Sequence, residues 1–235
     1  MIRVFFMMLC LPLVGFSQDA GVALTIRAAY HNPVKPLAEL FIADQTGAIV
    51  PLNLVGEMLS YPQVTVATNG NLVLYKEKMV DPKNPQASVA ATAKIPADWK
   101  KVIALIFPAA AAGDESSYRM LLINDAPTAF KKGESRIVNL TQVETAVQAG
   151  EHKVPVPSGK VTDLPAVKQV NDFNMAQTNF YYKDSDQWIP FTERQLQFLD
   201  STKRIFLIYL TPGSTQPFVT TLVDNTPVQV PPPSR

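Results

Sequence analysis

Apolar residues gather in short runs along this chain, and residues that favour turns separate the runs. Runs bounded by Asn, Asp, Gly and Pro are typical of β-strands. Asn69-Gly70 predicts the clearest hairpin, because both residues accept the positive φ angles of a tight turn. The first half contains these predicted strands: Val22 to Tyr30, Glu39 to Ala43, Ala48 to Leu54, Gln63 to Thr68, Leu72 to Lys76, Ser88 to Lys94, Val102 to Phe107 and Tyr118 to Ile123.

The second half continues the pattern, with one segment in which the period changes. Thr192 begins a stretch that has Gln195 three positions later, as in a capping box. Leu196 and Leu199 then lie three apart, so we expect one or two helical turns between Thr192 and Asp200. The predicted strands are Arg136 to Leu140, Val143 to Gln148, His152 to Val156, Lys160 to Val161 with Val167 to Val170, Asn179 to Lys183, Arg204 to Thr211 and Pro217 to Val223.

Similar runs recur about a hundred positions apart and in the same order, which predicts a duplication. The matched pairs are Lys100 to Phe107 with Lys203 to Leu210 (offset 103), Tyr118 to Pro127 with Phe218 to Pro227 (100), Val50-Pro51-Leu52 with Val154-Pro155-Val156 (104) and Tyr75-Lys76 with Tyr182-Lys183 (107). The expected fold is all-β: two tandem immunoglobulin-like antiparallel β-sandwiches, residues 18–128 and 129–228, lying end to end. One larger β fold is the alternative.

The chain begins with the three parts of a secretory signal peptide, residues 1–17. Arg3 supplies the positive charge, Val4 to Phe16 is an uncharged and mostly apolar stretch, and Ser17 precedes the expected cleavage site. That stretch is shorter than the roughly 20 residues of a membrane-spanning helix. We therefore expect an exported protein, periplasmic or extracellular, with no membrane insertion after cleavage. Residues 229–235 form a proline-rich tail that we expect to be disordered.

Charge and cysteine content narrow the possible partners and chemistry. The chain has 21 basic and 20 acidic residues, and cleavage removes Arg3, leaving 21 − 1 = 20 of each. With no basic cluster, nucleic acid is not an expected partner. Cys10 is the only cysteine and lies in the signal, so the mature chain would have no disulfide, thiolate metal site or cysteine nucleophile.

Sequence motifs of catalysis, cofactor binding and metal binding are missing. His31 and His152 are the only histidines, and each lies in a predicted turn where we expect it to be solvated. The chain contains no G-x-S-x-G, S-x-x-K or H-E-x-x-H motif and no glycine-rich phosphate loop. We therefore predict no catalytic residue, no cofactor and no metal ion.

One region combines acidic and aromatic residues in a way that could bind a ligand. In an extended segment, Asp184 and Asp186 would share one face, close to Tyr181, Tyr182 and Trp188. Aromatic rings beside carboxylates suit a sugar-binding face or a calcium-supported loop. The alternative is that the aspartates form a turn and the aromatic residues belong to the core.

The sequence favours an exported, non-catalytic module of the bacterial cell envelope, with a binding or structural role. Its partner would be another envelope protein or a glycan, bound through edge strands or end loops. The alternative is a carbohydrate-binding protein or a hydrolase accessory that uses the region around Asp184, Asp186 and Trp188.

Overall fold

The computed structural model describes residues 22–32, 39–55, 58–80, 83–109 and 118–224, which form β-strands joined by turns. Within these ranges there is no α-helix, and no helix has the length and apolar character needed to cross a membrane. The strands assemble into four sheets of four strands each, which confirms the prediction of an all-β protein. The predicted signal, residues 1–17, and the tail, residues 229–235, lie outside the described residues.

The first half of the chain forms two sheets that pack face to face. Its strands are β1 (Val22–Tyr30), β2 (Phe41–Ala43), β3 (Ile49–Pro51), β4 (Gln63–Ala67), β5 (Asn71–Tyr75), β6 (Val89–Lys94), β7 (Lys101–Pro108) and β8 (Tyr118–Asn124). One sheet has the order β4-β1-β7-β8 and the other β3-β2-β5-β6. Alternate residues of each strand point between the sheets. The apolar ones, such as Ile26, Leu72 and Ala104, form the first core and are fully buried.

The second half repeats this arrangement with its own core. Its strands are β9 (Ser135–Asn139), β10 (Thr145–Ala149), β11 (His152–Val156), β12 (Val161–Leu164), β13 (Met175–Asp184), β14 (Gln187–Gln197), β15 (Lys203–Tyr209) and β16 (Phe218–Asp224). The sheets have the orders β12-β9-β15-β16 and β11-β10-β13-β14. Ile137, Phe180 and Phe206 are fully buried between them, and the two phenylalanine rings meet edge to face at 5.3 Å.

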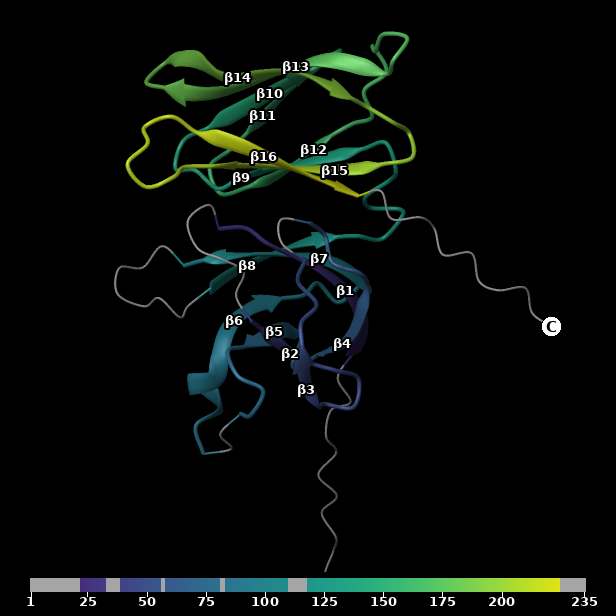
Figure 1. Ribbon diagram of the computed structural model, residues 1–235, viewed down its shortest axis with the longest axis vertical. Helices are drawn as coiled ribbons and strands as arrows, with labels where there is room; N and C mark the ends of the chain where they lie inside the picture. The colour runs from purple at the N-terminus through teal and green to yellow at the C-terminus, as the bar shows by residue number, and fades with distance from the viewer. Residues whose placement is uncertain (1–21, 33–38, 56–57, 81–82, 110–117, 225–235) are drawn as a thin grey trace, which may run out of the picture.

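The four sheets stack as layers, as Figure 1 shows, so that one sheet of each half lies in the middle of the molecule. A third hydrophobic group, here called the central cluster, fills the space between these two middle sheets. Its buried members are Ala29, Ile103, Leu105, Phe107, Ile123, Phe130, Val138, Ile205, Leu207 and Leu222. The expectation that the halves lie end to end is therefore wrong: they pack through facing sheets, because β7 and β15 in these sheets are apolar on both faces.

The segment between the halves is itself part of the central cluster. Phe130 lies between β8 and β9 and is 0% exposed. The Arg136 guanidinium lies 4.4 Å from the centre of its ring, and the Lys203 ammonium lies 4.9 Å from it. The backbone N–H of Phe130 donates to the carbonyl of Ala126. The connection is therefore anchored by packing and is not a free linker.

The two halves share one strand order, since adding eight to each strand number of the first half gives the second. In each middle sheet one pair is parallel, β1 with β7 and β9 with β15. The prediction of purely antiparallel sandwiches is therefore wrong. A parallel neighbour requires a crossover connection, and in each half the intervening strands supply it by passing through the outer sheet.

Two of the matches found in the sequence, Lys100 to Phe107 with Lys203 to Leu210 and Tyr118 to Pro127 with Phe218 to Pro227, are shifted by one residue from the equivalence that the structure shows. Ile103 and Ile205 both face the central cluster, at an offset of 205 − 103 = 102, and Ile123 and Leu222 do so at 222 − 123 = 99. The sequence matches gave 103 and 100. A shift of one residue turns a strand's side chains to the opposite face. Similarity between apolar runs could not detect the error, because these strands are apolar on both faces.

Predicted and observed strands agree closely in the first half. All eight predicted runs correspond to β1 to β8, with ends that differ by a few residues. In the second half, the predicted helical turns from Thr192 to Asp200 are wrong, because residues up to Gln197 belong to β14. Pairing along the whole of β13 decides this, with Thr192 opposite Phe180 and Leu196 opposite Ala176. The capping pattern is local, and the long hairpin overrides it.

The Asn69-Gly70 turn is tight, but it does not join neighbours in one sheet. Both residues have positive φ, 51° and 73°, and Thr68 pairs with Asn71 in an isolated bridge. Beyond that bridge β4 joins the middle sheet and β5 joins the outer sheet. The predicted hairpin is therefore a corner between two sheets, because its strands find better partners elsewhere.

Candidate functional site

The sequence-predicted site residues lie around the hairpin of β13 and β14, but they do not form one cluster. Tyr181 and Trp188 point to the outer face of the sheet, since Tyr181 pairs with Pro190, and Lys183, on the same face as Tyr181, pairs with Trp188. Tyr182 alternates with Tyr181 and points inward, where its ring lies 6.2 Å from that of Phe191. The hairpin therefore separates the two tyrosines onto opposite faces.

The two aspartates belong to the tip of the hairpin. Asp184 ends β13, and Ser185 and Asp186 form the turn before Gln187 begins β14. Ser185 has a φ of 55°, a conformation typical of a tight hairpin turn. The expectation that both carboxylates share one face of an extended segment is wrong, because the chain reverses between them. Among the described residues, no group of three or more His, Cys, Asp or Glu side chains is placed to hold a metal ion.

Phe191 packs inward at a β-bulge of β14. Phe180 pairs with Thr192 and Tyr181 pairs with Pro190, so β14 has one extra residue at Phe191. The Phe191 ring lies 6.1 Å from the buried ring of Phe180. The bulge and Pro190 also interrupt the free edge of β14, which discourages pairing with another strand.

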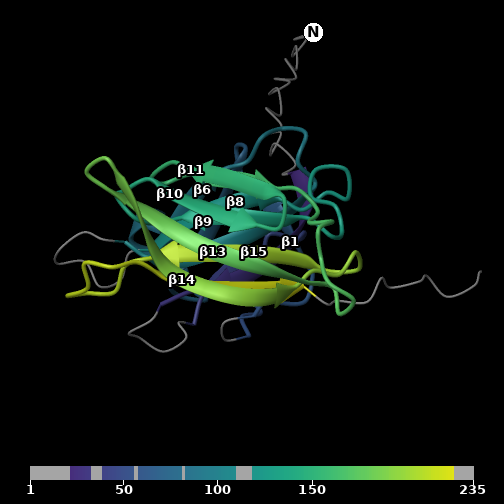
Figure 2. The same ribbon diagram turned by 90° about the horizontal axis from the view of Figure 1, so that it is seen from above.

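The outer face of this sheet carries a connected row of uncharged polar side chains. Gln177 Nε2 donates to Asn179 Oδ1 at 2.7 Å, and Asn179 Nδ2 donates to the Tyr181 hydroxyl at 3.3 Å. The hydroxyl donates in turn to Gln148 Oε1 on β10 at 3.4 Å. We call these four residues, together with Trp188, the amide face. Figure 2 looks down onto the sheet that carries it, and the strands of this sheet lie nearest the viewer.

Sequence reasoning found Tyr181 and Trp188 but missed the three amides. Gln177, Asn179 and Tyr181 alternate along β13, which is the period of one strand face. That alternation could have indicated them. Gln148 could not be found in this way, because it reaches the group only through the pairing of β10 with β13.

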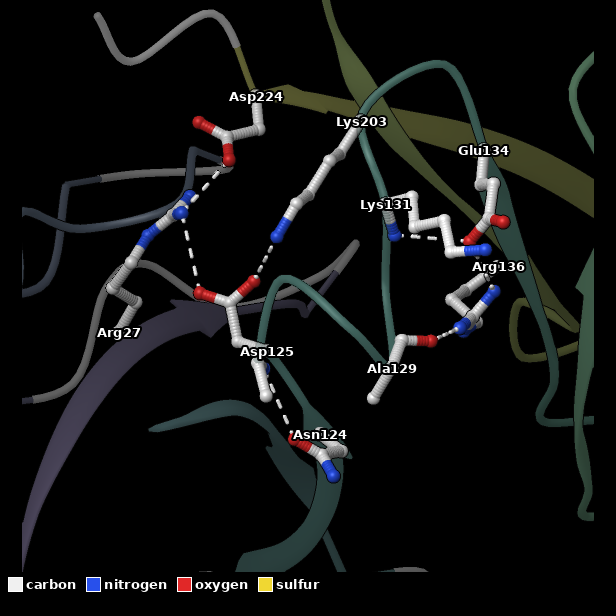
Figure 3. A network of polar contacts seen from close by, with 10 residues as sticks. Arg27, Asn124, Asp125, Ala129, Lys131, Glu134, Arg136, Lys203 and Asp224 are labelled. Carbon is white, nitrogen blue, oxygen red and sulfur yellow. Dashed lines mark hydrogen bonds and ion pairs between the residues drawn. The ribbon is translucent and has the colours of Figure 1, made fainter. Parts of the chain in front are cut away.

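A second polar group lies between the halves, and Figure 3 shows its contacts. Arg27 Nη1 lies 2.8 Å from Asp224 Oδ2 and 3.4 Å from Asp125 Oδ2. Lys203 Nζ lies 2.7 Å from Asp125 Oδ1. All four side chains are largely buried, and their charges sum to zero. We call this group the ionic clamp.

The geometry of the ionic clamp indicates a structural role. Its residues come from β1, the end of β8, β15 and the end of β16, so its ion pairs connect the two halves. Buried charges require partners, since an unpaired one costs several kcal/mol. Arg27 faces Ile103 in β7 as Arg136 faces Ile205 in β15. The halves therefore place arginine at equivalent positions of their middle sheets.

A cavity of about 380 Å³ opens at the seam between the halves. Phe107, Leu140 and Tyr209 line it together with His31 and Arg119. His31 is only 6% exposed, and its ring meets that of Tyr209 at 4.4 Å. The expectation of a solvated histidine is wrong here, because the apolar end of β1 continues into the seam.

His152 lies next to Glu151 in a turn of the second half, and the Glu151 carboxylate binds several groups there. Its Nε2 lies 3.2 Å from Glu151 Oε1. The Glu151 carboxylate also accepts the backbone N–H groups of Lys168 and Gln169, at 2.8 and 3.0 Å. Desolvation acts to raise the pKa of Glu151, but these backbone hydrogen bonds outweigh it and hold the pKa below its ordinary value. The group fastens a loop to the β10–β11 hairpin.

No model of a known protein family matches this chain, and no curated protein matches it either.

Proposed function

We propose that this chain is an exported, non-catalytic β protein of the bacterial cell envelope, and that it acts as a binding or structural module in the periplasm or outside the cell. The proposal is carried by the position of the buried charged side chains, which lie between the two halves. The ionic clamp gathers two cations and two carboxylates, and it connects the halves instead of lining a cleft. The central cluster adds an apolar contact between the same two sheets.

A module of this kind holds its surfaces in fixed relation. Apolar burial between the middle sheets opposes hinge motion between the halves, because separating them would expose the central cluster to water. The outer sheets of the stack then face away from each other. Such a scaffold suits a protein that presents a preformed face to a partner. The proposed partner is another envelope protein or a glycan.

We also propose that the halves are duplicated sandwiches of the immunoglobulin-like size class. Their identical strand order and separate cores support this proposal. The parallel pairs β1–β7 and β9–β15 depart from the all-antiparallel pairing of immunoglobulin sheets. The likeness therefore concerns size and two-sheet packing, with domains at residues 18–128 and 129–228.

Export is tested by expressing the full chain in a Gram-negative host and fractionating the cells. We expect a periplasmic or secreted product whose N-terminal residue is Gln18, as read by mass spectrometry. The matched control replaces Leu11 and Leu13 by Arg, which breaks the apolar stretch of the signal. A wild-type product that stays in the cytoplasm with residues 1–17 attached would overturn this part of the proposal.

The alternative function is carbohydrate binding by the region around Trp188, in a binding protein or a hydrolase accessory. Trp188 is 38% exposed and lies on the outer face of the sheet, so part of its ring is accessible to a ligand. The positions of Asp184 and Asp186 at the hairpin tip favour a binding face over a carboxylate pair acting together. Loss of glycan binding in Trp188→Ala, with an unchanged melting temperature, would support this alternative.

A further inference from the structure

We propose that the amide face binds a neutral polysaccharide chain. This inference rests on the carbohydrate-binding alternative above, and it assigns the contacts to Gln148, Gln177, Asn179, Tyr181 and Trp188 and not to the aspartates of the hairpin tip.

The centre of the amide face is uncharged. The outward positions of β10 and β13 at its centre are Ala146, Gln148, Gln177, Asn179 and Tyr181, which carry no charge at neutral pH. Charged side chains stand around this centre, at Lys153 on β11, Lys183 at the tip of the hairpin and Glu193 on β14. Solvent-exposed sheet faces commonly carry Lys and Glu. An uncharged centre with mixed charges around it suits a ligand that is itself uncharged.

The amide side chains of this face can form further hydrogen bonds with a ligand. An amide side chain offers two donors and two acceptor lone pairs. The row from Gln177 to Gln148 uses only one bond between successive members. Each amide therefore keeps donors and acceptor lone pairs that the row does not use. Sugar hydroxyls are both donors and acceptors, so they can satisfy such a row along its length.

Aromatic rings lie beside the amides on this face. Trp188 and Tyr181 share the face, and they lie diagonally across the pairs Lys183 with Trp188 and Tyr181 with Pro190. The C–H groups of a sugar ring pack against an aromatic ring, while the hydroxyls around the sugar's edge reach polar side chains. The amide face offers both kinds of contact within one sheet surface.

The amide face is long in the direction of the strand β13. From Gln177 to Lys183 the strand advances six residues, or about 20 Å at the usual rise of a β-strand. A sheet surface of this length is several times longer than one sugar ring. The hydrogen bonds among the side chains also hold them in place before any ligand arrives, which lowers the entropic cost of binding. An extended chain of sugars is therefore a better fit than a monosaccharide.

The test is native gel electrophoresis of the mature chain through gels that contain a soluble neutral polysaccharide. Hydroxyethyl cellulose, mixed-linkage β-glucan, mannan and starch serve as probes, and alginate serves as the anionic comparison. We expect one of the neutral polymers to retard the wild-type protein and alginate to have no effect. Trp188→Ala should weaken retardation about tenfold or more, the size expected for one exposed aromatic contact. Gln177→Ala combined with Asn179→Ala should weaken it several-fold.

Matched controls separate binding from folding. Tyr61→Ala removes an aromatic side chain that is 74% exposed in the first half, and Gln86→Ala removes an exposed amide there. Both should leave retardation unchanged, and all variants should keep the wild-type melting temperature within a few degrees.

Three outcomes would overturn the inference: no neutral polymer retards the folded wild type, alginate retards it more strongly, or Tyr61→Ala loses as much as Trp188→Ala. If photo-crosslinking in intact envelopes captures a protein while no polymer causes retardation, the amide face is rejected and the proposed binding module stands.

Discussion

The outer sheets of the two halves have the same strand order but present different surfaces. In the first half, β5 and β6 have 5 and 6 residues and are joined by the segment 76–88. In the second half, β13 and β14 have 10 and 11 residues and are joined by a two-residue turn. The second hairpin is about twice as long, although the pairing of each hairpin contains one register shift.

Two equivalent tyrosines show the consequence. Tyr75 pairs with Phe41, and Phe41 with Pro51, as Tyr181 pairs with Ala146, and Ala146 with Pro155. Tyr75 shares a hollow with Val80, Pro85 and Gln86, so these three residues of the connecting segment lie beside the outer face of the first half. The Tyr181 hydroxyl instead joins the row of amides. The middle sheets thus have the same arrangement, while the outer sheets present different side chains.

The largest expected effect comes from the shared middle of the molecule. Phe130→Ala removes a fully buried ring from the central cluster and should lower the free energy of unfolding by about 4 kcal/mol. Urea denaturation followed by tryptophan fluorescence measures it, since Trp99 and Trp188 report on different halves. We expect one shared transition. The exposed Phe173→Ala should change little. Two separate transitions, of which only one shifts, would break the view that the halves form one unit.

The ionic clamp should show the next effect. Asp125→Asn leaves Lys203 without its carboxylate and Arg27 with Asp224 alone, so we expect a loss of about 3 kcal/mol in the free energy of unfolding. The control, Asp163→Asn, removes an ion pair to Arg136 in which the carboxylate is exposed. It should cost less than about 1 kcal/mol. Equal losses in the two variants, measured by urea denaturation, would contradict the assigned role.

Equivalent turn glycines sharpen the comparison between the halves. Gly47 in the β2–β3 turn and Gly150 in the β10–β11 turn both have positive φ, 84° and 52°. A Cβ at Gly47 would meet nothing within 4 Å, whereas at Gly150 it would lie 2.6 Å from Val167 Cγ1. We expect Gly47→Ala to cost about 1 kcal/mol through backbone strain, and Gly150→Ala at least twice that through added overlap. The melting temperatures of both variants measure these losses. A larger loss for Gly47→Ala than for Gly150→Ala would contradict the close packing of Gly150 against Val167.

The smallest expected effect concerns pH. Hydrogen bonds lower the pKa of Glu151 below its ordinary value of 4.5, so the ionised carboxylate stabilises the fold above about pH 4.5 and loses this effect as the pH falls through the folded-state pKa. Glu151→Gln should therefore melt earlier than wild type at pH 7, and the difference should shrink towards pH 3. Asp44→Asn is the counterpart in the other half, where hydrogen bonds from Thr46 lower the pKa of an exposed carboxylate. A gap for Glu151→Gln that widens in acid would contradict the assignment.

The candidate site was only partly predictable. Trp188 and Tyr181 stand out in the sequence because large aromatic residues cluster there. The grouping with Asp184 and Asp186 failed because a chain reversal at Ser185 cannot be told from an extended segment by spacing alone. Gln177 and Asn179 alternate with Tyr181 along one strand, which is a weak local signal, whereas Gln148 gives none. Only the pairing of β10 with β13 brings Gln148 to the Tyr181 hydroxyl.

The sequence by itself determined most of the strands, because short apolar runs between Asn, Asp, Gly and Pro leave the backbone few other conformations. It also indicated that two similar halves follow each other. The tertiary structure alone decided which face of each strand is central, since β7 and β15 are apolar on both faces. It likewise decided that β14 is a strand, that Asn69-Gly70 is a corner, and that Arg27 meets carboxylates from both halves. Those outcomes depend on partners distant in the chain, which local pattern does not contain.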